Sequence, residues 1–100
     1  MIKFTILYPY AEGKKFDMDY YINKHLPLCQ KLIGAAFKGG GVDAGLDVGA
    51  PPAFIAIGYL LFDSLEAFQD AFPLVQQSLT EDIVNFTDIK PVMQFSEVRM

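Results

Sequence analysis

The chain has 100 residues, the size of one domain, and its 12 acidic and 8 basic side chains give a net charge of −4. Without a basic run it is a poor partner for nucleic acid, and no segment approaches the roughly 20 apolar residues of a membrane span. The single cysteine excludes an intrachain disulfide, and the N-terminus lacks the pattern of a signal peptide, so we expect a cytoplasmic protein.

The first half of the chain predicts a strand, a helix and a weaker strand. Residues 2–9 alternate between two faces, and the loop after them leads to a helix over 18–33 that Asp17 can cap. Pro27 lies inside this helix, where it removes a hydrogen bond and collides with the preceding turn, so a kink or a break is expected. Residues 37–43 form a poor strand because three glycines follow one another.

The second half predicts a buried strand, a divided helix and a last strand. Residues 53–62 are apolar on both alternating faces, which is typical of a strand that is covered on both sides. A helix capped by Asp63 or Ser64 follows, and Pro73 divides it. Residues 81–90 are expected to link this helix to a final strand over 91–99.

The order of elements is β–α–β–β–α–β, which predicts a single α+β domain over residues 1–100 with a ferredoxin-like fold and a four-stranded antiparallel sheet. Both helices lie on one face of such a sheet. The other face of strand 53–62 therefore needs a second cover, and the chain has no further element to supply it. We expect a homodimer in which two sheets pack face to face as a dimeric α+β barrel.

Several segments resemble the EthD family of dimeric α+β barrel proteins, which is named for a protein linked to ethyl tert-butyl ether degradation. The resemblance covers nearly the whole chain and rests on these segments: Leu7-Tyr8-Pro9, Phe16-Asp17-Met18-Asp19-Tyr20-Tyr21, His25-Leu26-Pro27-Leu28, 58–68, Asn85-Phe86-Thr87-Asp88 and Pro91. It implies the fold predicted above. For function it implies kinship with monooxygenases of aromatic polyketides, haem-degrading enzymes and isomerases, and with proteins called oxidoreductases.

His25 is the only histidine and the leading catalytic candidate. In a cleft between the first helix and the sheet it can act as a general acid or base, or bond a substrate. The alternative is a partly buried histidine bonded to a backbone carbonyl. Tyr21 lies one helical turn before His25 and can orient the imidazole or act as an acid; alternatively it is a core aromatic.

The candidate substrate-binding residues are Tyr8, Tyr59 and Met18. Met18 shares the helix face of His25, and the two tyrosines line the same cleft if their strands turn them toward the helices. Core packing is the alternative for each of them. Cys29, one turn after His25, can form a Cys–His pair, but a buried apolar thiol is the simpler interpretation.

The remaining polar residues do not form a recognisable cofactor site. Asp17, Asp19 and Asp88 can pair with His25 only if the fold brings them close. No metal site is expected from one histidine and one cysteine, and Gly39–Gly41 match no phosphate-binding or dinucleotide motif.

We therefore expect no cofactor and a small hydrophobic ligand. The leading hypothesis is an enzyme or pathway accessory of the oxidoreductase, isomerase or dehydratase type. A non-catalytic carrier, or a structural protein with a filled cleft, is the alternative.

Overall fold

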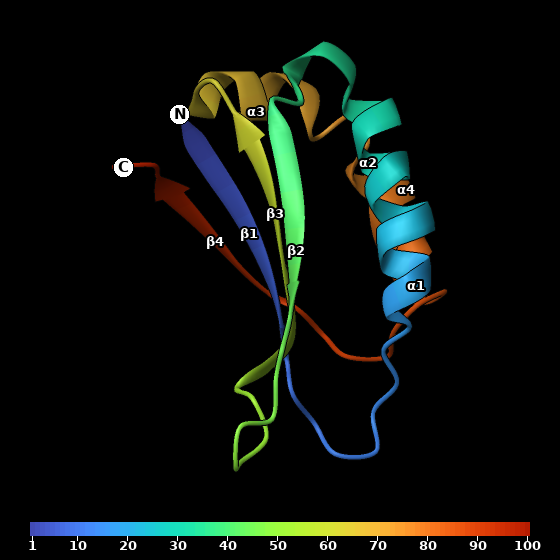
Figure 1. The fold of residues 1–100 in the computed structure, drawn as a ribbon. Coiled ribbons are helices and arrows are strands. Elements are labelled where there is room, and N and C mark those ends of the chain that lie inside the picture. The colour runs from blue at the N-terminus through green and yellow to red at the C-terminus, as the bar shows by residue number, and fades with distance from the viewer.

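Four strands form one antiparallel sheet in the order β2-β3-β1-β4, and the helices gather against one of its faces (Figure 1). The computed structural model describes all 100 residues. The strands are β1 (Ile2–Pro9), β2 (Gly39–Ala44), β3 (Phe54–Phe62) and β4 (Val92–Glu97). The helical segments are α1 (Met18–Tyr20), the π-helical turn η1 (Tyr21–His25), α2 (Leu26–Ile33), the 3-10 turn η2 (Gly34–Ala36), α3 (Leu65–Ala71) and α4 (Gln76–Ile83). This order confirms the predicted ferredoxin-like α+β fold. None of the helices has the length and apolar character needed to cross a bilayer.

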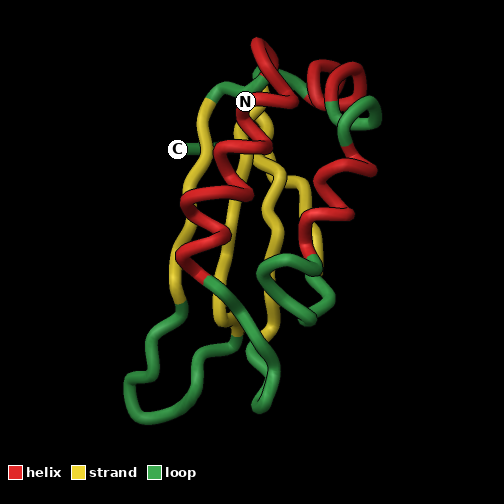
Figure 2. The backbone as a smooth tube through the Cα atoms, turned by 90° about the vertical axis from the view of Figure 1, so that its right-hand side faces the viewer, coloured by secondary structure: helices red, strands yellow, loops and turns green.

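The core lies between the sheet and the helices, which cover the strands in the turned view of Figure 2. Alternation along β1 points Phe4 and Tyr8 toward the helices, and both are buried. Their partners in β3 are Leu60 and Ala56, which are buried on the same face. The buried side chains form two clusters, one around Phe4 and Leu60 and one around Tyr8 and Phe86.

The first helical stretch begins as predicted and passes Pro27 without a break. The Asp17 carboxylate accepts a hydrogen bond from the backbone N–H of Tyr20 at 3.0 Å. Before Pro27 the helix widens into the π turn η1, in which the N–H of Leu26 donates to the carbonyl of Tyr21. A wider turn relieves the crowding that the proline ring creates, so the expected kink or break takes the form of a π-helical turn. Such turns often occur at functional sites, and this one contains His25.

The second helix is divided as expected, but it extends further than the sequence indicated. The Ser64 hydroxyl caps α3 by accepting from the N–H of Ala67 at 3.1 Å, and Pro73 falls between α3 and α4. The expected link over 81–90 is wrong for its first three residues, because α4 continues to Ile83. The strands predicted over 37–43 and 91–99 run over 39–44 and 92–97.

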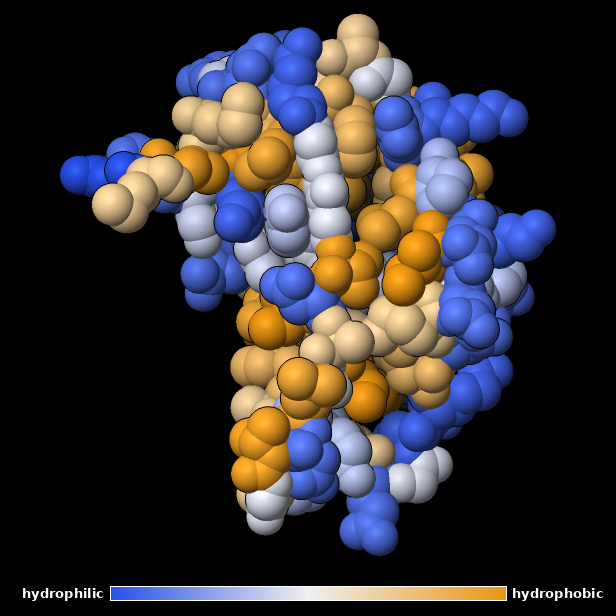
Figure 3. Space-filling view, viewed as in Figure 1, coloured by the Kyte–Doolittle hydropathy of each residue, from blue (hydrophilic) through white to orange (hydrophobic).

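The sheet face away from the helices is largely apolar at its centre. By alternation and strand register it carries Leu7, Ile55, Ile57, Tyr59, Leu61 and Val92. None of these side chains is fully buried in the single chain. In Figure 3 the outer surface of the helices is hydrophilic, whereas hydrophobic residues gather over the strands and between the two layers. The structure therefore leaves open the second face of β3 that the sequence predicts to be covered.

Candidate functional site

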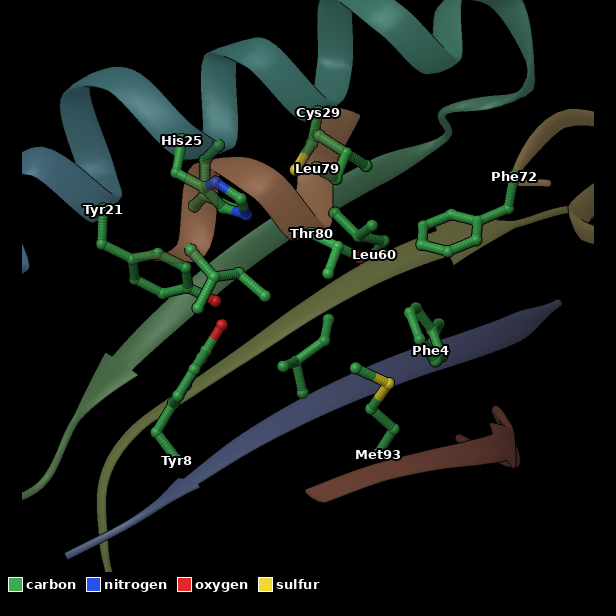
Figure 4. Close-up of a pocket in the computed structure, with 13 residues that line it drawn as sticks. Phe4, Tyr8, Tyr21, His25, Cys29, Leu60, Phe72, Leu79, Thr80 and Met93 are labelled. Carbon is green, nitrogen blue, oxygen red and sulfur yellow. The ribbon is translucent and has the colours of Figure 1, made fainter. Parts of the chain in front are cut away.

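A small apolar cavity lies between the sheet, α2 and α4, with His25 in its wall (Figure 4). Its free volume is about 50 Å³, and eleven of its thirteen lining residues are hydrophobic. Phe4 and Leu60 contribute from the sheet, and Leu79 contributes from α4. The cavity is open on one side, where the lining residue Met93 is 54% exposed. The hollow therefore reaches the surface on this side.

His25 is held in this wall by a carboxylate from the opposite helix. Its Nδ1 lies 2.9 Å from Oδ2 of Asp82, and the two side chains are only 8% and 14% exposed. A carboxylate only accepts, so the hydrogen-bonded Nδ1 carries the proton of the neutral imidazole. Nε2 then keeps its lone pair, and it has no hydrogen-bond partner in the chain although it is not fully buried. The unpaired nitrogen is thus a proton acceptor on a residue that lines the cavity.

The surroundings keep this pair as a neutral imidazole and an ionised carboxylate. Burial lowers the pKa of His25, and the opposing effect of Asp82 does not cancel it. Burial alone would raise the pKa of Asp82, but hydrogen bonds from His25, Asn85 and Tyr20 outweigh burial and lower it. The Tyr20 hydroxyl donates to Oδ1 of Asp82 at 2.7 Å, and the Asn85 amide donates to the same oxygen at 2.9 Å. Three donors therefore fix the carboxylate that orients His25.

Two neighbouring aromatic rings, which lie 4.9 Å apart, pack against the imidazole. The Tyr21 ring stacks on it with centroids 5.6 Å apart and planes 22° apart. The fully buried Phe86 ring lies 4.7 Å away at 55°. With these two rings packed against it and Nδ1 bonded, the imidazole has little freedom to turn, which is the preorganisation that a general base requires.

Tyr8 and Tyr21 meet at the end of the same cavity. Figure 4 shows the two hydroxyl groups pointing toward one another from β1 and η1. The two residues are 1% and 2% exposed. Burial raises the pKa of both phenols, so both hydroxyls stay protonated at neutral pH. They can donate hydrogen bonds but supply no negative charge.

The structure thus brings together three of the five predicted site residues: His25, Tyr21 and Tyr8. Tyr59 does not line this cavity, because strand alternation places it on the outer face of β3, where Lys3 Nζ lies 4.6 Å from its ring centroid. Met18 packs against the aromatic cluster around Phe86 and is not among the cavity residues.

The other candidate residues either form hydrogen bonds elsewhere or stay protonated. Asp17 caps the first helix, and Asp88 accepts from the backbone N–H of Lys15 at 2.9 Å. Cys29 lines the cavity, but burial raises the pKa of its thiol to about 12, which keeps it protonated. No three side chains of the metal-binding types come close together.

Asp82 belongs to the candidate site but was not expected from the sequence, because it falls in the segment expected to be a link. A signal was available: Ile83 and Phe86 lie four and seven residues after Leu79 and continue the apolar helical stripe. An extended helix would have placed Asp82 beside that stripe. Its distance of 57 residues from His25 in sequence gives no local sign of the pairing.

The fold and this cavity define a ferredoxin-like α+β protein with a His–Asp pair in an apolar hollow. A model of the EthD domain matches residues 12–90, and the chain belongs to the EthD family.

Solved structures of relatives share the fold across almost the whole chain. An EthD-like protein from Ralstonia eutropha JMP134 is 41% identical, with a TM-score of 0.93 over 99% of this chain and 92% of that one. An ethyl tert-butyl ether (EthD) family protein from Bacillus halodurans C-125 is 20% identical, with a TM-score of 0.75 over 98% of each chain. A dimeric ferredoxin-like protein of unknown function from Bacteroides fragilis NCTC 9343 is 10% identical, with a TM-score of 0.62 over 97% of this chain and 95% of that one. A comparison with curated proteins gave no match.

Proposed function

We propose that this protein is a small enzyme that removes a proton from a hydrophobic organic molecule, with Nε2 of His25 as the general base. The observation that carries the proposal is the 2.9 Å bond between Nδ1 and Asp82, which leaves Nε2 unpaired at an apolar cavity. The reaction needs only side chains of the chain itself. An oxidoreductase activity, which the family resemblance suggests, draws no support from this geometry.

Asp82 supports proton removal in two ways. Its carboxylate fixes the tautomer, so the lone pair of Nε2 is available at neutral pH. When Nε2 takes a proton the ring becomes a cation, and the adjacent carboxylate stabilises that charge. The apolar walls favour a hydrophobic substrate and exclude water that would compete for the base.

A generic C–H acid tests the base without knowledge of the natural substrate. In 5-nitrobenzisoxazole, loss of the ring C–H proton to Nε2 forms a C≡N bond and breaks the N–O bond, which releases a coloured phenolate. We expect wild type to catalyse this ring opening and His25→Gln to lose roughly 100-fold or more, since general-base catalysis contributes about that much. Asp70→Ala, which removes an exposed carboxylate from α3, serves as the control and should react like wild type.

The outcome separates an enzyme from a carrier. Catalysis that depends on His25 supports the proposal. Ring opening at the rate of free imidazole in solution, or equal rates in wild type and His25→Gln, contradicts it. Binding of the probe without ring opening, retained in His25→Gln, would indicate the carrier instead.

We further propose that the working form is a homodimer in which a second copy covers the outer face of the sheet. The half-buried apolar side chains on that face support this assembly, as does the dimeric state given for the relative from Bacteroides fragilis. Light scattering after gel filtration should give twice the mass of 11.2 kDa, and a monomer mass at micromolar concentration would contradict the dimer.

A further inference from the structure

The facing hydroxyls of Tyr8 and Tyr21 can share only one hydrogen bond between them. Each phenol carries one donor, and a facing pair can use only one of the two between its own members. Each of the two hydroxyls has the other as its hydrogen-bond partner. One O–H donor is therefore not used within the pair, and it lies at the end of the cavity where the two residues are 1% and 2% exposed.

Gly58 leaves room for this arrangement. It lies in β3 beneath the Tyr21 ring, and a Cβ atom at this position would overlap the Tyr21 hydroxyl. The hydroxyl thus occupies the space that any other residue in β3 would fill with its side chain. The position of the Tyr21 hydroxyl depends on this glycine as well as on the π turn that carries its ring.

His25 and the tyrosine pair line one hollow. The imidazole stacks on the Tyr21 ring, and all three residues belong to the same cavity wall (Figure 4). A proton acceptor and a neutral proton donor therefore stand on adjacent parts of one small apolar space. This combination suits a substrate that loses a proton at carbon and gains negative charge at a neighbouring oxygen.

We infer that the Tyr8–Tyr21 pair is the oxyanion-binding subsite of this cavity and that the substrate is a hydrophobic carbonyl compound with an acidic C–H next to the carbonyl. This inference rests on the proposed function of His25 as a base. Nε2 takes the proton, the C–H electron pair forms a C=C bond, and the carbonyl π pair moves to oxygen. The resulting enolate oxygen accepts the free tyrosine proton. Transfer of the proton from Nε2 to the enolate oxygen gives the enol, an isomer of the substrate, so the step needs no oxidant or reductant.

A phenolate is the appropriate binding probe, because its charged oxygen on an apolar ring resembles the enolate. We would titrate 4-nitrophenolate, at a pH where it is ionised, into wild type, Tyr21→Phe and Tyr59→Phe and follow its absorbance. Tyr21→Phe should weaken binding by about tenfold or more, the usual effect of one hydrogen bond to a charged oxygen. Tyr59→Phe removes the same group from the outer face of the sheet and should bind like wild type.

Gly58→Ala tests the same subsite without removing a hydroxyl. It should weaken 4-nitrophenolate binding to a similar degree, since the new methyl group displaces the Tyr21 hydroxyl. Melting curves of each variant show whether it is folded at the temperature of the titration. Absence of binding to wild type, or equal affinity in wild type and Tyr21→Phe, would overturn the subsite.

Two further measurements distinguish failure of this inference from failure of the proposed function. His25→Gln should keep its affinity for 4-nitrophenolate, which shows that the subsite acts without the base. Deuterium exchange at the α-carbons of 2-indanone, followed by NMR in D₂O, should be catalysed by wild type and reduced about 100-fold in Tyr21→Phe. If 5-nitrobenzisoxazole is opened but 2-indanone does not exchange, His25 is supported as a general base and the inference of a carbonyl substrate is overturned. If neither probe reacts while phenolate binding still depends on Tyr21, the proposed function fails and only the subsite stands.

Discussion

Replacing Asp82 by alanine should destabilise the protein measurably, because the carboxylate accepts a hydrogen bond in the interior. The His25 side chain is 8% exposed, and its Nδ1–H has no acceptor other than Oδ2 of Asp82. A buried donor left without a partner costs about 1–3 kcal/mol. The bonds from Tyr20 and Asn85 add little, since both donors reach solvent once the carboxylate is gone.

The expected change in melting temperature follows from the size of the domain. For a chain of this length about 1 kcal/mol corresponds to roughly 4–8 °C, so the central expectation for Asp82→Ala is a fall of about 10 °C. Asp70→Ala is a matched control: Asp70 is the second-last residue of α3, as Asp82 is of α4, and it is exposed. Both substitutions gain the same helix propensity and remove the same charge from a helix end.

Thermal unfolding followed by circular dichroism at neutral pH measures both variants against wild type. The difference between Asp82→Ala and Asp70→Ala isolates the contact with His25. Equal melting temperatures for the two variants would refute the reasoning, since they would mean that the carboxylate does not bond the imidazole in solution.

Three more predictions concern pH, the thiol and the assembly. The folded pKa of His25 is lowered, so its contribution to stability is complete above the ordinary value of 6.5 and is lost as the pH falls, when the unfolded imidazole takes up a proton first. The melting temperature of wild type should therefore drop more steeply below pH 6.5 than that of His25→Gln; parallel curves would contradict this. Cys29 should react with a thiol reagent such as dithionitrobenzoate only after unfolding, and rapid reaction of the native protein would show that the thiol is accessible. Ile57→Glu introduces a charge on the outer sheet face and should convert the proposed dimer to a monomer in light scattering, whereas an unchanged dimer would place the interface elsewhere.

The elements of the fold were predictable because each carries a local signal. Alternation marks β1 and β3, the side chains of Asp17 and Ser64 cap the helices as expected, and Pro73 separates α3 from α4. Pro27 was predicted to disturb its helix, but the form of the disturbance was not. A break and a π turn relieve the same steric conflict, and packing of the helix on the sheet favours the form that keeps the helix continuous.

The candidate site was predictable only in part, because it is assembled by contacts between distant segments. His25 was predicted as the only histidine, Tyr21 from its spacing of four residues before His25 on one helix, and Tyr8 from its place on a strand that can face the helices. Asp82 reaches His25 from the other helix, and no periodicity in either segment indicates that contact. Gly58 has no side chain and so gives no sequence signal of a site. Its place beneath the Tyr21 hydroxyl depends on how helix and sheet are packed.

The central claim is that Asp82 holds His25 as the tautomer whose Nε2 is a free base. Because His25 is the only histidine, nitrogen NMR of the imidazole reports on it without ambiguity. In neutral to mildly alkaline solution we expect a protonated Nδ1 and an unprotonated Nε2, with this pattern lost in Asp82→Ala. A protonated Nε2 beside a bare Nδ1, or an imidazolium ring at neutral pH, would contradict it.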